Sequence, residues 1–142
     1  MMPNVIFQEL EIDDQLETLL GGSGRIIESQ SVDSRPFSDG YFVTVSFNEM
    51  LMSPVSALAR GPRTVTIAVH HAQEIDRDFF SLTAILNRID EIILPIEDQE
   101  GTDGLRVTTI RRTGRSGNLI DDGYKTITRY ATYGVLYDEF VA

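Results

Sequence analysis

The two histidines, His70 and His71, are the side chains of this sequence best suited to bind a transition metal or to transfer protons near neutral pH. They are adjacent in a segment with the composition of a strand, where successive side chains point to opposite faces. Both imidazoles cannot readily ligate one metal unless a bulge intervenes. We therefore expect no metal site at these residues.

Carboxylates are the other candidates for chemistry. The run 97–103 is acidic but lacks the D-x-D-x-D-G…E spacing of a calcium loop, which favours a solvated acidic loop. The neighbouring carboxylates Asp13 and Asp14, and Asp121 and Asp122, have no accompanying base, nucleophile or oxyanion motif. The chain has no cysteine and no G-x-S-x-G motif. We expect no catalytic activity and no cofactor.

Length and composition indicate one domain spanning residues 1–142, with 42% hydrophobic residues. The net charge of −10 disfavours a protein that grips the nucleic-acid backbone, because that function needs a basic face. The N-terminal segment is acidic, and no window approaches 18 uncharged apolar residues. We expect the protein to be synthesised in the cytoplasm and not to associate with membranes.

The charge is distributed unevenly along the chain. Residues 1–24 carry −5, residues 25–63 are balanced, residues 64–104 carry −7 and residues 105–142 carry +2. Regions of opposite charge on one small subunit favour head-to-tail contacts between copies.

Hydrophobic spacing predicts the elements of the first half. Apolar residues within 5–20 have loosely helical spacing, and the glycines of 21–24 should end this helix. A short strand is expected within 25–32. A period-two pattern then predicts half-buried strands at 41–47 and 64–70.

The second half contains the longest predicted helix, residues 78–94, with apolar residues at three- and four-residue steps. Asp76 or Asp78 could cap its N-terminus. The segments 105–113 and 124–137 are rich in residues that strands favour, and they should form a long antiparallel pair.

Three long connections remain, at about 48–63, 95–104 and 114–123. The last could act as a flexible arm that offers charge and a small apolar anchor, Leu119 and Ile120. The order of elements favours an α+β fold, with a mainly antiparallel or mixed sheet, one long helix packed on it and a short N-terminal helix. Composition and spacing alone thus indicate an acidic α+β interaction protein.

The order of three sequence blocks resembles the tail terminator family of long-tailed bacteriophages, the tail-completion proteins that are similar to minor tail protein U. The blocks are the N-terminal helix ending Leu19-Leu20-Gly21-Gly22 and leading through Gly24-Arg25-Ile26 to Tyr41-Phe42-Val43; the strand 63–69 with the helix Phe79 to Ile93; and the final strands from Ile110-Arg111-Arg112 through Asp121-Asp122 to Tyr133-Gly134-Val135-Leu136-Tyr137.

This resemblance implies a structural virion protein without enzymatic activity. Members of the family assemble as a hexameric ring on the last ring of tail-tube protein, stop tube growth and present the docking face for head-completion or connector proteins. The implied location is the virion neck, at the head-proximal end of the tail. Phage DNA would pass through the ring without specific binding, and an acidic channel wall would repel its phosphates.

A ring of acidic subunits needs complementary contacts between neighbours. We expect the basic C-terminal segment of one subunit to meet either the acidic loop or the acidic N-terminal helix of the next. The residues predicted for this interface are Arg111, Arg112, Arg115, Leu119, Ile120, Glu97, Asp98, Glu100 and Asp103.

Three alternatives stay open at this point. A head–tail connector or stopper of the phage neck has a similar pattern of elements. A small metal-dependent hydrolase or nuclease could use Asp98 or Asp103. A host regulatory or toxin-neutralising binding protein is the third.

Overall fold

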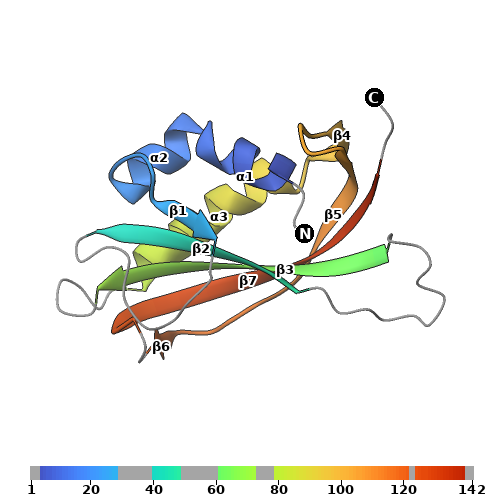
Figure 1. The fold of residues 1–142 in the computed structure, drawn as a ribbon. Helices are drawn as coiled ribbons and strands as arrows, with labels where there is room; N and C mark the ends of the chain where they lie inside the picture. Colours follow the sequence, from blue (N-terminus) through green and yellow to red (C-terminus); the bar gives the residue numbers. More distant parts are fainter. Residues whose placement is uncertain (1–3, 29–39, 49–60, 73–78, 122–123, 140–142) are drawn as a thin grey trace.

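A seven-stranded sheet forms the centre of the protein, and three helices lie on one side of it (Figure 1). The computed structural model describes residues 4–28, 40–48, 61–72, 79–121 and 124–139. The strand order is β1-β2-β3-β7-β5-β4, and β6 also pairs with β7. The elements are α1 (Asn4–Glu11), α2 (Asp14–Leu20), β1 (Ile26–Glu28), β2 (Tyr41–Asn48), β3 (Gly61–Ala72), α3 (Phe80–Ile93), β4 (Glu97–Glu100), β5 (Leu105–Arg115), β6 (Leu119–Asp121) and β7 (Thr126–Glu139).

The sheet is mixed but mainly antiparallel, which confirms the predicted α+β class. Only β1 and β2 pair in parallel among the described strands. Strand β7 lies at the centre, paired with β3 on one side and with β5 and β6 on the other. The predicted antiparallel pairing of the C-terminal strands is therefore confirmed.

Helix α3 packs on the centre of the sheet, and α1 and α2 pack against α3. The apolar stripe predicted for α3 faces the core: Leu82, Ile85, Leu86, Ile89 and Ile93 are all buried. The sheet contributes alternate residues on the same side, as period-two strands must. These include Val43, Val45, Val65, Ile67, Val69, Ala131, Tyr133 and Val135.

The N-terminal segment forms two helices, so the prediction of one helix over 5–20 was wrong. Asp13 breaks the segment because its backbone is extended and its carboxylate accepts a hydrogen bond from the Leu16 amide at 2.8 Å. This is the arrangement of an N-cap. The predicted glycine stop is confirmed: Gly21 ends α2 in the left-handed conformation, with φ 86°.

The bounds of α3 nearly match the prediction, but its N-terminus does not. Phe79 occupies the N-cap position without a side-chain hydrogen bond. Asp76 and Asp78, the predicted caps, lie outside the described residues.

The predicted loops contain additional strands. Residues 97–100 form β4 because they pair with β5. Within 114–123, β5 continues to Arg115 and β6 then pairs with β7, so this segment extends the hairpin and is not a free arm. Strand β3 begins at Gly61, inside the predicted loop 48–63, while residues 49–60 lie outside the described part.

The prediction that β2 is half-buried was wrong for residues 42–45, whereas Ser46 and Phe47 are partly exposed. Phe42 and Thr44, on the face opposite the helices, are buried, like Val43 and Val45 on the helix face. Strict alternation of polar and apolar residues does not reveal this, because the buried Thr44 is satisfied by a hydrogen bond to a neighbouring strand.

In the described segments, no helix has the length and apolar character required to span a membrane.

Candidate functional site

Two of the three predicted interface arginines are bound within their own chain. Arg112 Nη1 lies 2.7 Å from Asp90 Oδ2, and Arg115 Nη2 lies 2.6 Å from the same oxygen. Both side chains leave β5 on the helix face of the sheet, where Asp90 projects from α3. The two arginines therefore fasten the hairpin to the helix.

Tyr133 completes this cluster around Asp90. Its hydroxyl donates a short hydrogen bond to Asp90 Oδ1, and the residue is fully buried. Burial and the hydrogen bond to Asp90 both raise the pKa of Tyr133. Each carboxylate oxygen of Asp90 thus has a donor, as a mostly buried charge requires.

Arg111 differs from its neighbours. It lies between two residues of the helix face, so its side chain leaves the opposite face of the sheet, beside Gly134 in the register. The side chain is exposed, and within the described residues it has no ion pair or hydrogen bond. Of the three predicted arginines, only Arg111 remains available to a partner.

The predicted acidic residues also divide into side chains that are available to a partner and one that is bound within its own chain. Glu97, Asp98 and Glu100 are exposed on β4, an edge strand of the sheet. Asp103, in contrast, accepts hydrogen bonds from the Asn4 amide at 2.8 Å and from the Leu105 amide at 3.1 Å. Asp103 therefore holds the first residue of α1 against the start of β5.

Arg106 of the same chain partly balances the negative charge of the β4 edge. Arg106 Nη2 lies 2.8 Å from Asp138 Oδ2. The hydrogen bond to Asp138 raises the pKa of Arg106, and the nearby charges of Asp98 and Glu100 add to this effect.

Leu119 and Ile120, the predicted apolar anchor, are 40% and 61% exposed. They project from β6 and border a groove of about 290 Å³ on the sheet face away from the helices. Hydroxyl groups of Thr44, Ser46 and Thr66 line the other side of this groove. The anchor is exposed as predicted, but a paired strand holds it.

The two histidines point to opposite faces, as predicted from their adjacency. His71 stacks on Tyr41, with ring centroids 4.0 Å apart. His70 is buried on the face away from the helices and stacks on Phe42. Among the described residues, no three His, Cys, Asp or Glu side chains are close enough to hold a metal ion.

His70 belongs to a polar cluster that sequence patterns did not indicate. Its Nε2 lies 2.9 Å from Thr44 Oγ1, and its Nδ1 lies 3.2 Å from Thr126 Oγ1 and 3.0 Å from Thr128 Oγ1. Burial lowers the pKa of His70 to about 4, although the charge of Asp121 acts in the opposite direction. The imidazole is therefore neutral at physiological pH.

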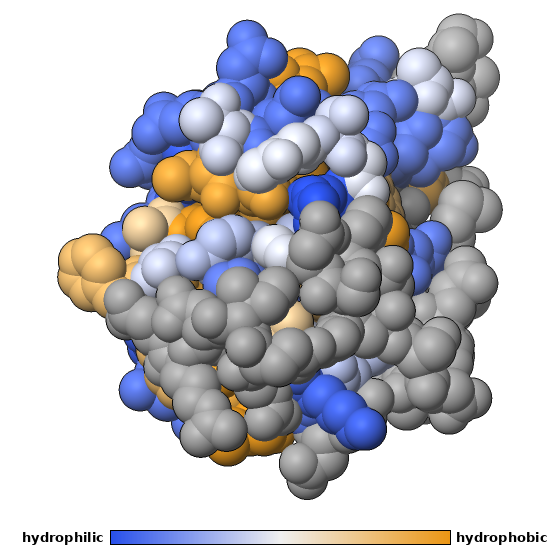
Figure 2. All heavy atoms as spheres, turned by 90° about the vertical axis from the view of Figure 1, so that its left-hand side faces the viewer, coloured by the Kyte–Doolittle hydropathy of each residue, from blue (hydrophilic) through white to orange (hydrophobic). Residues whose placement is uncertain are grey.

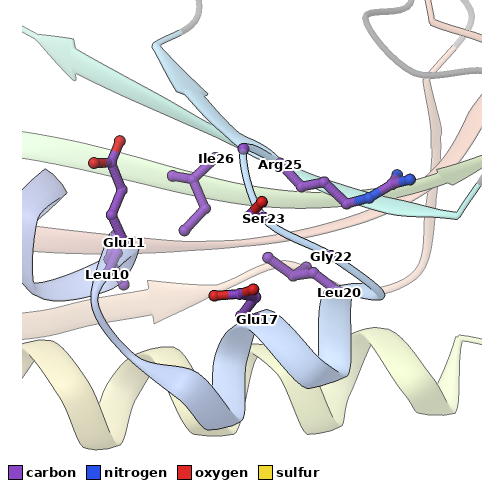
Figure 3. A pocket seen from close by; sticks show the side chains of 9 residues that line it. Leu10, Glu11, Glu17, Leu20, Gly22, Ser23, Arg25 and Ile26 are labelled. Carbon is purple, nitrogen blue, oxygen red and sulfur yellow. The ribbon is translucent and has the colours of Figure 1, made fainter.

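A pocket of about 280 Å³ between α1, α2 and β1 was also missed (Figure 3). Leu10, Leu20 and Ile26 supply its apolar surface, while its charged lining residues are Glu11, Glu17 and Arg25. The glycines of 21–24 indicate only a helix stop, and no periodic pattern signals that this segment also borders a pocket. Hydrophobic and hydrophilic surfaces adjoin on the side of the molecule that carries α2 (Figure 2).

No protein-family model matches the sequence, and no curated protein matches it. The fold is similar to that of a solved chain described as "Virion of native gene transfer agent (GTA) particle", with a TM-score of 0.64 and 12% sequence identity. The match covers 93% of this chain and 90% of that chain. At this level of identity the similarity shows a shared fold.

Proposed function

We propose that this chain is a structural component of a phage-like virion and that it terminates the tail tube as a ring of six identical subunits. The observation that carries the proposal is the fold shared with a chain of a gene transfer agent virion over nearly the whole of both chains. The order of sequence blocks that resembles the tail terminator family supports the more specific role. The proposed location is the neck, between tail tube and head, and the proposed role is not enzymatic.

Contacts between neighbouring subunits follow from the side chains that the fold leaves available. Arg111 is an exposed cation on one part of the sheet, and Glu97, Asp98 and Glu100 form an acidic edge on another. We propose that Arg111 of one subunit meets this edge in the next, with Leu119 and Ile120 adding apolar contact. A head-to-tail arrangement of this kind can close into a ring.

The same charge supports the passage of DNA through the ring. A chain with net charge −10 repels phosphate where its acidic residues face the channel, so DNA would slide through without being held. A channel lined by arginine would contradict this part of the proposal.

The experiment is to polymerise the tail-tube protein of the same genome with and without this chain and to image the products by electron microscopy. A terminator caps tubes at one end and stops their growth. A connector or stopper of the neck would leave bare tubes growing and would bind only after another protein had capped them. The second result would keep the virion assignment and overturn the role in termination.

A further inference from the structure

The pocket between α1, α2 and β1 combines an apolar surface with two carboxylates (Figure 3). Leu10 and Leu20 are 1% and 2% exposed, so the floor is part of the hydrophobic core. Glu11, at the end of α1, and Glu17, on α2, are exposed at its rim. In the described part of the chain neither carboxylate has a side-chain hydrogen bond or an ion pair.

Arg25 also lines the pocket, so the lining carries two carboxylates and one cation. Arg25 extends away from Glu11 and Glu17 (Figure 3), and its Nη1 donates to the Tyr41 carbonyl at 3.2 Å. Its guanidinium also lies against Gly40, where an added Cβ would be 3.2 Å from Nη1. The pocket therefore keeps a net negative charge.

The walls of the pocket are fixed by contacts made elsewhere. Asp13 caps α2 and also binds Arg88 of α3, with Asp13 Oδ2 2.5 Å from Arg88 Nη2. This ion pair sets the corner between the two N-terminal helices. The arrangement is thus preorganised, which reduces the entropy lost when a ligand binds.

Strand β1, whose Ile26 lines the pocket, lies at one end of the described sheet. Strand β1 ends the strand order of the sheet, and no described strand pairs with its outer edge. The Val43 amide donates to the Arg25 carbonyl, and Ile26 is the register partner of Val43. In this parallel ladder the backbone groups of Ile26 and Glu28 point to the outer edge. An extended segment could add there by main-chain hydrogen bonds.

We propose that this pocket receives the side chain of a lysine or arginine carried by an extended segment of a partner protein that adds to the outer edge of β1. The aliphatic part of such a side chain would cover the apolar floor, and its charged end would lie between Glu11 and Glu17. A purely apolar side chain would leave both carboxylates without a counter-charge. This inference does not depend on the proposed role in the virion.

The test uses the full chain and two peptides, Ac-Val-Thr-Lys-Val-Thr-NH2 and the same peptide with norleucine in place of lysine. Methyl NMR follows Leu10, Leu20 and Ile26 during titration. We expect saturable shifts with the lysine peptide and binding at least about tenfold weaker with norleucine, because only the ammonium group is lost. Absence of saturable shifts, or equal affinities for the two peptides, would overturn the proposal.

Two variants of equal net charge separate the pocket from general electrostatics. The double variant Glu11→Gln/Glu17→Gln should lower affinity for the lysine peptide to that for the norleucine peptide. The control Glu97→Gln/Glu100→Gln, on β4, should change the affinity for the lysine peptide by less than about twofold, because exposed charges at a distance are screened. An equal loss in both variants would show nonspecific attraction and would contradict the assigned site.

Strand addition and the identity of the occupant are tested separately. A lysine peptide N-methylated on the backbone of lysine and of both flanking residues loses edge hydrogen bonds in either strand direction, and we expect its affinity to fall at least about tenfold. Unchanged affinity would overturn the addition to β1. Concentration-dependent shifts of the same methyl groups without peptide would identify a second copy as occupant and would overturn the assignment to a different protein.

Discussion

Arg115 of β5 lies 2.6 Å from Asp90 of α3, and this ion pair connects the long C-terminal hairpin to the helix that covers the sheet. The side chains are only 19% and 12% exposed. A basic residue that the sequence suggests as a partner contact is therefore part of the internal structure. The distinction between internal and available charges determines which substitutions should affect folding and which should affect assembly.

Asp90→Ala should destabilise the fold by about 3 kcal/mol, because it leaves Arg115 and the buried Tyr133 hydroxyl without their acceptor. The measurement is urea unfolding followed by circular dichroism. The control, Glu97→Ala, removes an exposed carboxylate and should change stability by less than about 0.5 kcal/mol. Equal stability of the two variants would contradict the role given to Asp90.

Neighbouring arginines should respond differently to charge reversal. Arg112→Glu places a carboxylate beside Asp90 and should cost about 1 kcal/mol of stability, since Arg112 is 45% exposed. Arg111→Glu should leave stability within about 0.5 kcal/mol but prevent subunit contacts on tube ends. Unchanged rings with Arg111→Glu, seen by electron microscopy, would exclude Arg111 from the subunit interface.

His70 should make stability depend on pH in a defined window. Its pKa of about 4 in the folded state lies below the ordinary value of 6.5, so the unfolded chain binds more protons between these values. The contribution of His70 to the free energy of unfolding is greatest above pH 6.5. It falls as the pH decreases and levels off near pH 4, with a total change of up to about 3 kcal/mol.

Titration of the His70 ring by NMR measures this pKa directly. We expect no protonation above about pH 5. The replacement His70→Gln should remove the corresponding slope from a plot of unfolding free energy against pH. A midpoint above pH 6 would refute the description of His70 as a desolvated, neutral side chain.

Asp13 has two functions that two variants can separate. Asp13→Ser keeps an N-cap acceptor but loses the ion pair with Arg88, while Asp13→Ala loses both. The hydrogen bond from Arg88 lowers the pKa of Asp13, in agreement with a stabilising contact. Alanine should cost about 1 kcal/mol more than serine in chemical denaturation. Equal costs would show that the cap contributes nothing.

Gly21→Ala should destabilise the chain by about 1 kcal/mol, because Gly21 has φ 86° and a side chain is unfavourable in that conformation. Space is not the cause, since an added Cβ would meet nothing within 4 Å. Gly117→Ala is the matched control: its Cβ is equally unobstructed, its φ lies outside the left-handed region, and thermal unfolding should be nearly unchanged. A similar loss in both would contradict the conformational explanation.

Periodic patterns predicted the elements whose burial follows a simple rule. The apolar stripe of α3 and the alternation of Val65, Ile67 and Val69 were sufficient to predict that helix and strand β3, because these side chains face one core. Strand β4 has no such pattern: its residues Glu97, Gln99 and Glu100 form a strand only because they pair with β5. Short strands of this kind depend on a tertiary partner that the local sequence does not contain.

The candidate interface was predicted less completely for a similar reason. Arg111 and Arg112 differ because strand parity places them on opposite faces, so that only Arg112 reaches Asp90, and bulges in β5 shift that parity. The bulges, near Thr109 and Gly114, leave no mark in composition. The polar cluster around His70 was likewise hidden, since Thr44 lies on β2 and Thr126 and Thr128 lie on β7, both far from His70 in the sequence.

The most direct test of the proposed function is electron microscopy of tail tubes that grow from the tail-tube protein of the same genome in the presence of this chain. We predict a single ring of this protein on one end of each tube and no further growth at that end. Tubes of unlimited length with no bound protein at either end would contradict the role as a tail terminator.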